Sequence, residues 1–261
     1  MARKIVITSG KGGVGKTTVT ANLGQALASL GLRVLLVDVD VGLNNLDVVL
    51  GVEDKVLYDI SDVLEGRCRL KQALIQDNNR SNLYILPSGN LNSSTINGQN
   101  IKLLLESVVG LFDYVLIDCP AGIDVGFHRA VSCVDEAIIV TTANMTSIRD
   151  ADKVISILNS YKLNSVKIVL NRVRGDLIMN EKIMSPLDVQ DILRTELIGI
   201  LPEEDAVFLS NGKSLPNGSD SKKAYKLLAV NVHKGSKKMY NATRKYSGFF
   251  GSIRRGIKGS I

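Results

Sequence analysis

Short apolar runs, rich in β-branched residues, recur along this chain of 261 residues and are separated by longer stretches of mixed polarity. Runs of this kind, without internal alternation of polar and apolar residues, are typical of strands buried on both faces of a parallel sheet. The sequence therefore predicts strands at residues 4–8, 33–38, 83–86, 113–118, 136–141, 167–171 and 197–201.

Between most of the predicted strands, apolar residues recur with the period of an α-helix. One such face consists of Val19, Leu23, Ala26, Leu27 and Leu30. Two further faces consist of Leu103, Leu104, Val108 and Leu111, and of Ile148, Ala151, Ile155 and Leu158. Strands that alternate with helices in this way predict an α/β fold, with a doubly wound, mostly parallel sheet flanked by helices.

The organisation of the chain changes only toward its C-terminal end. No repeat and no boundary interrupts the pattern before residue 211, where Gly, Pro, Ser and Asn gather in a predicted loop. A last helix with one apolar side is predicted at residues 222–233. We therefore expect a folded domain over residues 1–233, a basic linker over 234–245 and an amphipathic segment over 246–261.

The charge of the chain is distributed unevenly, although its composition, with 45% hydrophobic and 22% charged residues, is that of a globular protein. The formal net charge is +6, and no acidic residue follows Ser221. The basic residues of this last part are Lys222, Lys223, Lys226, Lys234, Lys237, Lys238, Arg244, Lys245, Arg254, Arg255 and Lys258. Such a region favours a polyanionic partner, either anionic lipid or nucleic acid. Because Trp is absent and aromatic residues are few, a large stacking platform for nucleic acid is not expected.

Cysteine usage and hydropathy bear on the compartment. Cys68, Cys119 and Cys133 show no metal-binding spacing, and an odd number of cysteines suits a reducing environment. The first apolar run is too short for a signal peptide, and no stretch reaches the apolar length of a membrane span. We expect a cytoplasmic protein, attached at most to a membrane surface.

The glycine-rich stretch after the first predicted strand carries the clearest chemistry. Gly10, Gly15, Lys16 and Thr17 fit the P-loop pattern G-x-x-x-x-G-K-[ST], between a predicted strand and a predicted helix. Glycines let backbone N–H groups turn toward phosphate oxygens at a helix N-terminus. In this pattern the lysine neutralises the β- and γ-phosphates, and the threonine hydroxyl ligates Mg²⁺. A chance glycine turn is the alternative, and the alignment of strand, loop and helix argues against it.

Acidic residues close two of the predicted strands. Asp118 ends an apolar strand, the position at which P-loop proteins hold Mg²⁺ through a carboxylate, and we prefer this role to a simple turn cap. Asp38 and Asp40 lie on the same face at the end of another strand. For these two residues both interpretations stay open: carboxylates that orient an attacking water and tune Mg²⁺, or two solvated loop acids.

The stretch SGKGGVGKTT also holds a second lysine, Lys11, which the P-loop pattern does not require. With it, KGGVGKTT resembles the deviant Walker A motif of the ParA/MinD family of ATPases. The blocks DVDVGLNNLDVVLG, NLYILPSG, IDCPAGI, SIRDADKV and LIGILPEEDAV follow in the order of that family's septum site-determining members. The resemblance covers essentially the whole chain and implies a P-loop ATPase domain that binds ATP and Mg²⁺.

The resemblance also implies roles for individual residues. Lys11 would reach across a homodimer formed with ATP to the phosphates of the partner subunit, as an arginine finger does in other enzymes. The residues expected to contact the nucleotide phosphates are Gly10, Lys11, Gly12, Gly13, Val14, Gly15, Lys16, Thr17 and Thr18. Hydrolysis would depend on Lys11, Lys16 and Asp40, with assistance from Asp38. The expected metal ligands are Thr17, Asp118 and Asp40.

Further residues are placed only by their match to the family. Asn171, Pro202 and Glu203 would lie on the adenine side of the nucleotide, and Asn45 near the dimer face. Asp150 and Asp152 match the helix that contacts regulatory partners. Cys119 stands where many relatives have Ser, and we expect no loss of function from it.

The last sixteen residues, YSGFFGSIRRGIKGSI, form a separate pattern. Apolar residues recur with helical spacing and the basic residues fall mostly off that stripe, which is typical of a helix lying in a membrane surface. The predicted membrane residues are Phe249, Phe250, Ile253, Arg254, Arg255, Ile257 and Lys258. Glycines weaken this helix, so one segment binds marginally, and pairing two in a dimer would add an avidity factor of about 10²–10⁴. The alternative is that the stripe docks on the body of the protein.

Together these features predict an ATP-dependent dimerising ATPase that lies on the inner face of the cell membrane, or in the plastid stroma. By resemblance, its partners would be a division inhibitor such as MinC and a topological regulator such as MinE. The resemblance leaves a ParA-type partition ATPase, which binds DNA as an ATP dimer, as the alternative. A scaffold that binds ATP without appreciable turnover is a third possibility.

Overall fold

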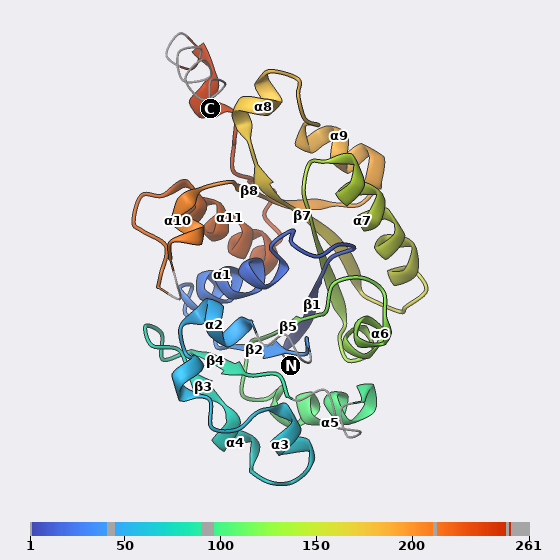
Figure 1. Ribbon diagram of the computed structural model, residues 1–261, viewed down its shortest axis with the longest axis vertical. Helices are drawn as coiled ribbons and strands as arrows, with labels where there is room; N and C mark the ends of the chain where they lie inside the picture. The colour runs from blue at the N-terminus through green and yellow to red at the C-terminus, as the bar shows by residue number, and fades with distance from the viewer. Residues whose placement is uncertain (1, 41–44, 90–96, 211–212, 249–250, 252–261) are drawn as a thin grey trace.

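The computed structural model describes residues 2–40, 45–89, 97–210, 213–248 and 251 (Figure 1). Its strands are β1 (Arg3–Thr8), β2 (Val34–Asp38), β3 (Ile75–Gln76), β4 (Leu83–Leu86), β5 (Tyr114–Asp118), β6 (Glu136–Thr141), β7 (Ser165–Val173) and β8 (Leu197–Pro202). Its longer helices are α1 (Lys16–Ala28), α5 (Gly98–Val108), α7 (Met145–Leu158), α9 (Pro186–Leu193) and α11 (Asp220–Lys234). Its shorter ones are α2 (Leu46–Leu50), α3 (Ile60–Leu64), α4 (Leu70–Ala73), α6 (Val125–Val131), α8 (Gly175–Met179), α10 (Asp205–Phe208), η1 (Glu53–Lys55) and η2 (Arg244–Tyr246).

The strands form one sheet in the order β3-β4-β2-β5-β1-β6-β7-β8. All neighbouring strands are parallel except the edge strand β3, which runs antiparallel to β4. β1 lies between β5 and β6, so the chain crosses to one side of β1 first and to the other side later. The carboxyl end of β1 is therefore a topological switch point, the place where open α/β sheets bind ligands.

Helices cover both faces of the sheet, as Figure 1 shows, with α1, α2 and α11 on one side and α5, α6, α7 and α9 on the other. Successive strand residues point to opposite faces and enter two separate apolar clusters. Ile5 and Ile7 pack beneath α1, whereas Val6 packs with Phe127 of α6 on the other face. Burial on both faces explains why these strands read as continuous apolar runs.

The predicted α/β fold with a doubly wound, mostly parallel sheet is confirmed, and each predicted strand is present. The apolar face predicted for the helix before β5 is only partly right: Val108 is buried and Leu104 packs against the core, but α5 also buries Ile101 and Leu105, which the prediction left out. On a helix that begins at Gly98 this stripe is centred on Ile101, so Leu103 points away from it and is 59% exposed. Leu111 lies beyond the helix and is also exposed.

The segment predicted to be a basic linker lies against the body of the protein where it is described. The side-chain amide of Asn231 donates a 3.0 Å hydrogen bond to the carbonyl of Lys238. Lys245 forms an ion pair with Asp220, and Ala242 is nearly buried. The three-part division of the chain stays a prediction. Within the described ranges, no helix has the length and apolar character needed to cross a bilayer.

Phe127 offers a direct test of the packing on the α6 side of the sheet. It is the largest side chain among those that are fully buried in the described residues. We expect Phe127→Ala to lower the free energy of unfolding by about 3–5 kcal/mol, because it removes buried surface and leaves a cavity. Denaturant unfolding followed by circular dichroism measures this loss.

The matched control is Phe208→Ala, because Phe208 on α10 is 85% exposed. This change should alter the free energy of unfolding by at most about 0.5 kcal/mol. Equal effects of the two substitutions would contradict the described core.

Candidate functional site

The loop between β1 and α1 has a backbone that only glycine adopts readily. Gly13 and Gly15 have positive φ angles of 79° and 91°. α1 then begins at Lys16 with no side-chain cap and no acidic residue in its first turn. Its first backbone N–H groups therefore stay available to an anion, and the helix dipole adds positive potential there.

Close contacts hold the two ends of this loop. A Cβ atom at Gly10 would lie 2.3 Å from the carbonyl oxygen of Asp150 on α7. A Cβ atom at Gly15 would lie 2.5 Å from the side-chain nitrogen of Asn171, whose amide donates a 2.8 Å hydrogen bond to the carbonyl of Val14. The loop is thus clamped between α7 and the end of β7. Gly12 and Gly13 have no such neighbour within 4 Å.

A buried polar cluster lies directly beneath the loop. Lys16, 7% exposed, places its Nζ 3.0 Å from Oδ1 of Asp118. The Thr17 hydroxyl donates a 2.6 Å hydrogen bond to the other carboxylate oxygen of Asp118. The hydroxyl of Thr20 donates to Oδ1 of Asp118 at 3.0 Å. The register of the sheet makes this cluster possible, because Asp118 pairs with Ile7 of β1, just before the loop.

The groups of this cluster and the start of α1 fit Mg²⁺ and a nucleotide. A hydroxyl and a carboxylate already in contact, Thr17 and Asp118, are oxygen ligands of the type that Mg²⁺ takes. The uncapped start of α1 and the ammonium of Lys16 provide the positive potential that a triphosphate needs. The structure therefore brings together the predicted residues Lys16, Thr17 and Asp118.

Asp40 and Asp38 have different surroundings, although both were predicted near the phosphates. Asp40 is partly exposed, and its Oδ2 lies 3.9 Å from Nζ of Lys16. Asp38 is buried, and its carboxylate accepts hydrogen bonds from the backbone N–H groups of Asp40, Asn45 and Leu46 at 2.9–3.4 Å. These contacts show Asp38 anchoring the chain after β2, so it is not one of two solvated loop acids.

The electrostatics of these two carboxyl groups follow from burial. Desolvation, followed by the nearby charge of Asp118, raises the pKa of Asp38 to about 7. Burial also raises the pKa of Asp40, against the opposing influence of Lys16. The pKa of the Cys119 thiol rises to about 12 for the same reason, which leaves this buried residue unreactive.

Lys11 differs from Lys16 in its exposure and in its ion pairing. It is exposed on the rim of the loop, and within the described part of the chain no carboxylate forms an ion pair with it. It lines a cavity of about 280 Å³ together with Gly12, Arg172, Arg174 and Glu203. The cation at the centre of the site is therefore Lys16, and the second lysine faces outward.

The remaining predicted residues lie at the periphery or beyond the described residues. Pro202 ends β8, and the N–H of Glu203 donates to the carbonyl of Val173, so both lie beside the end of β7 that carries Asn171. Asp150 pairs with Lys153 on α7, and Asp152 is exposed there. Val14 is buried, and Thr18 is half-buried in the first turn of α1. The membrane residues predicted between 249 and 258 lie outside the described residues.

Sequence reasoning missed two residues of the site. Thr20, one helical turn after Lys16, completes the hydrogen bonds to Asp118, and its spacing was the signal that could have revealed it. Arg172, directly after Asn171, has a positive φ of 53°, which is unusual for a residue with a side chain. The apolar pattern of the strand does not predict a positive φ at Arg172.

The raised pKa of Asp38 predicts a pH dependence of stability. Its ordinary pKa is 3.8 and its folded-state pKa is about 7, so between these values the folded protein binds more protons than the unfolded chain. Stability from this group therefore falls as pH rises from about 4 to about 7. We expect Asp38→Asn to flatten that slope, measured by denaturant unfolding without nucleotide. Asp191→Asn, on the exposed face of α9, is the control, and an unchanged slope in Asp38→Asn would refute the assignment.

Comparison with known proteins agrees with this geometry. A family model described as an AAA domain matches residues 2–171. The chain is 49% identical over 217 residues to a putative septum site-determining protein MinD of Guillardia theta, covering 83% of this chain and 81% of that protein. It is 46% identical over 217 residues to the septum site-determining protein MinD of Synechocystis sp., covering 83% and 82%.

Solved structures extend the likeness to three dimensions. A chain of the MinC:MinD cell division protein complex of Aquifex aeolicus superposes with a TM-score of 0.84 at 42% identity, covering 92% of this chain and all of that one. MinD of Pyrococcus horikoshii, solved with Mg-ADP, gives a TM-score of 0.80 at 35% identity, covering 90% and 97%. A ParA family ATPase of Chlorobium tepidum, at 21% identity and a TM-score of 0.73, shares the fold alone. Together with the clamped P-loop and the Lys16–Asp118 cluster, relatives of this identity show that the chain belongs to the MinD branch of the ParA/MinD family, the septum site-determining P-loop ATPases.

Proposed function

We propose that this ATPase binds ATP with Mg²⁺ at the loop between β1 and α1 and dimerises over the bound nucleotide through Lys11. Dimerisation then attaches it to an anionic membrane surface, where it recruits a division inhibitor and so positions the division septum. The observation that carries the proposal is the pair of lysines with opposite surroundings. Lys16 is buried against Asp118, whereas Lys11 is exposed on the loop rim.

The chemistry of the buried cluster supports magnesium-dependent hydrolysis of ATP. Lys16, which lies 3.0 Å from Asp118 and 3.9 Å from Asp40, would turn toward the phosphates, because a triphosphate carries more negative charge than either carboxylate. Thr17 and Asp118 would hold Mg²⁺, which neutralises charge on the phosphate oxygens. Asp40, which is partly exposed and lies two residues after the end of β2, is the carboxylate best placed to orient an attacking water. Asp38 supports it by fixing the backbone of the chain that follows.

The exposed position of Lys11 supports its role in a second subunit. A lysine on the rim, without a carboxylate partner among the described residues, can pair with an external anion. Two subunits that face each other across bound ATP would bring the negative charge of two triphosphates into the interface, and a cation from each subunit would offset part of it. Association would then depend on the terminal phosphate, and hydrolysis would release the dimer.

Partners are proposed from the relatives and from α7. The solved relative from Aquifex aeolicus is a complex of MinC and MinD, which supports a MinC-type inhibitor as a partner here. Asp150 and Asp152 lie on the accessible side of α7, where such an inhibitor or a MinE-type regulator could contact them. The backbone of Asp150 touches Gly10, so a partner bound at α7 would lie next to the loop that carries Lys11.

The C-terminal sequence supports attachment to a membrane. Residues 246–261 carry the apolar stripe and the basic residues Arg254, Arg255 and Lys258, and contain no acidic residue. Each basic residue near anionic lipid contributes about 1 kcal/mol, and a dimer presents two such segments at once. The apolar stripe favours this reading over DNA binding, which needs the basic residues only.

The two lysines give the first test of the proposal. We expect Lys11→Ala to bind nucleotide with unchanged affinity but to abolish dimerisation, because the cation supplied to the partner is lost. Lys16→Ala should weaken nucleotide binding at least about thirtyfold, since a buried charge contact is lost. Titration calorimetry measures binding, and sedimentation velocity with a non-hydrolysable ATP analogue and Mg²⁺ measures dimerisation.

The matched control is Lys226→Ala, which removes an exposed lysine of α11 and should change neither quantity. A Lys11→Ala protein that forms a dimer of normal affinity would overturn the proposed role of Lys11. Circular dichroism before each titration verifies that the variants are folded.

Truncation after Tyr246 tests the membrane step. The shortened protein should bind ATP and dimerise as before but lose co-sedimentation with vesicles that contain anionic phospholipid, because the apolar stripe is gone. The full chain should bind these vesicles with ATP and release them with ADP. Continued co-sedimentation of the truncated protein would contradict the membrane role of the segment. Retardation of DNA by the full chain, without vesicle binding, would instead support the partition-type alternative.

A further inference from the structure

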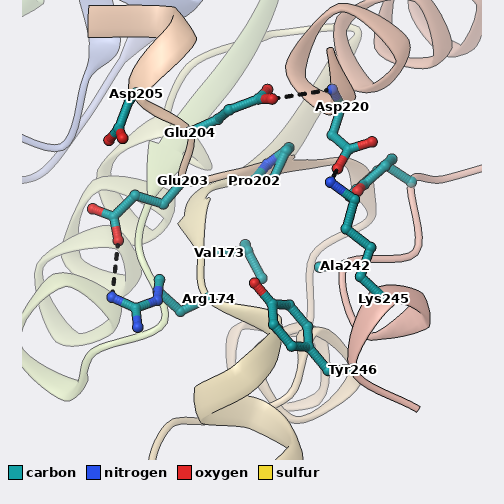
Figure 2. Close-up of a pocket in the computed structure, with 12 residues that line it drawn as sticks. Val173, Arg174, Pro202, Glu203, Glu204, Asp205, Asp220, Ala242, Lys245 and Tyr246 are labelled. Carbon is teal, nitrogen blue, oxygen red and sulfur yellow. Dashed lines mark hydrogen bonds and ion pairs between the residues drawn. The ribbon is translucent and has the colours of Figure 1, made fainter. Parts of the chain in front are cut away.

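A second cavity, of about 430 Å³, lies at the carboxyl ends of β7 and β8 (Figure 2). Val173 and Arg174 line it from the end of β7, and Pro202 and Glu203 from the end of β8. Gly175, Glu204, Asp205 and Asp220 add to this lining, and one further side comes from much later in the chain. Tyr240, Ala242, Lys245 and Tyr246 of the segment that follows α11 close that side. Figure 2 shows the Tyr246 ring directed into the cavity, across from Arg174 and Glu203.

This cavity adjoins the rim of the phosphate loop. Arg174 and Glu203 line both this cavity and the smaller one that contains Lys11 and Gly12. The two spaces therefore lie on either side of the same pair of residues. A nucleotide whose phosphates occupy the loop would extend its base along this edge of the sheet, toward the larger cavity.

The lining of the larger cavity suits a planar heterocycle. Val173, Pro202 and Ala242 supply apolar surface, and the Tyr246 ring supplies an aromatic one. The Glu203 side chain is 49% exposed and can accept hydrogen bonds from an exocyclic amino group. The other lining groups are mostly charged, namely Arg174, Glu204, Asp205, Asp220 and Lys245. A base would therefore lie against the apolar patch beside Tyr246, with the charged groups around its edge.

The late segment is held to the body by contacts at the cavity wall and beside it. The carbonyl of Ala242 lies so close to Gly175 that a Cβ atom there would be 1.9 Å from it. Asn231 bonds to the carbonyl of Lys238, and Lys245 pairs with Asp220. The Asn241 side chain accepts hydrogen bonds from the N–H groups of Thr243 and Arg244, which sets the turn before Tyr246.

We propose that Tyr246 forms one wall of the subsite for the nucleotide base, so that a bound base fixes the start of the C-terminal segment. The proposal rests on the function proposed above, in which this segment, residues 246–261, attaches the protein to membrane. The base and the membrane segment then share one residue. A base bound in this subsite would fix the position of Tyr246, where the membrane segment begins. This effect would add to any effect of dimerisation.

The first experiment compares a ligand that has a base with one that has none. Mg²⁺-ADP fills both the loop and the base subsite, whereas Mg²⁺-tripolyphosphate fills the loop alone. We expect Tyr246→Ala to weaken ADP binding at least about fivefold, the size of one lost aromatic stacking contact, with tripolyphosphate binding unchanged. Tyr246→Phe should restore ADP affinity because it keeps the ring. Tyr161→Ala, beyond the far end of α7, is the control.

The second experiment reads the segment itself by amide hydrogen exchange of the full chain. Mg²⁺-ADP should slow exchange in residues 238–246, and Mg²⁺-tripolyphosphate should slow exchange only in residues 10–18. Gly175→Ala, which displaces the carbonyl of Ala242, should reduce the protection that ADP gives to residues 238–246.

The outcomes separate this proposal from the proposed function. ADP affinity unchanged in Tyr246→Ala, or residues 238–246 unaffected by ADP while residues 10–18 are protected, would overturn the base wall and leave the ATPase function intact. Absence of ADP and tripolyphosphate binding to the unmodified chain would overturn both. Equal losses for the two ligands in Tyr246→Ala would also overturn the base wall, because they would show a general structural defect.

Discussion

The contact between Lys16 and Asp118 is the interaction on which the site depends. A lysine and an aspartate that are both almost fully buried would be costly apart, and each offsets the desolvation of the other. Their contact requires the carboxyl ends of β1 and β5 to lie side by side, which the central position of β1 ensures. The hydroxyl groups of Thr17 and Thr20 complete the cluster, so the start of α1 is tied to β5 before any ligand arrives.

Asp38 at the end of β2 and Asp40 just after it have different roles because they are buried to different extents. Asp38 lies opposite Asp118 in the register of the neighbouring strands, and its carboxylate accepts hydrogen bonds from three backbone N–H groups. Asp40, two residues later, keeps a partly exposed carboxylate near Lys16. One residue shapes the chain after the strand and the other faces the space where the phosphates would lie. Alternation along the strand alone does not separate these roles, because both positions share one face.

Much of the fold was predictable because parallel strands buried on both faces leave an unmistakable apolar pattern. The P-loop residues were predictable because their spacing is fixed by phosphate geometry. The short helices α2, α3, α8 and α10 were missed, since they span too few residues to show a period. Part of the buried face of α5 was assigned wrongly because Leu103 and Leu111 are apolar yet exposed. The packing of residues 238–246 against β7 and β8 could not be predicted from a basic stretch without a clear period, because it depends on contacts such as Asn231 with Lys238 that are set by tertiary structure.

Glycine is required in the phosphate loop for two different reasons, depending on the position. At Gly10 and Gly15 the neighbouring α7 and Asn171 leave no room for even a methyl group, so the folded protein itself excludes every other residue. At Gly12 and Gly13 the surroundings are open, and only the backbone conformation or an incoming anion restricts the choice. Substitution at the ends of the loop is thus limited by neighbouring atoms, whereas substitution in its middle is limited by the backbone conformation of Gly13 and by the bound phosphates. In a relative that no longer binds nucleotide, we expect the glycines in the middle of the loop to be substituted before those at its ends.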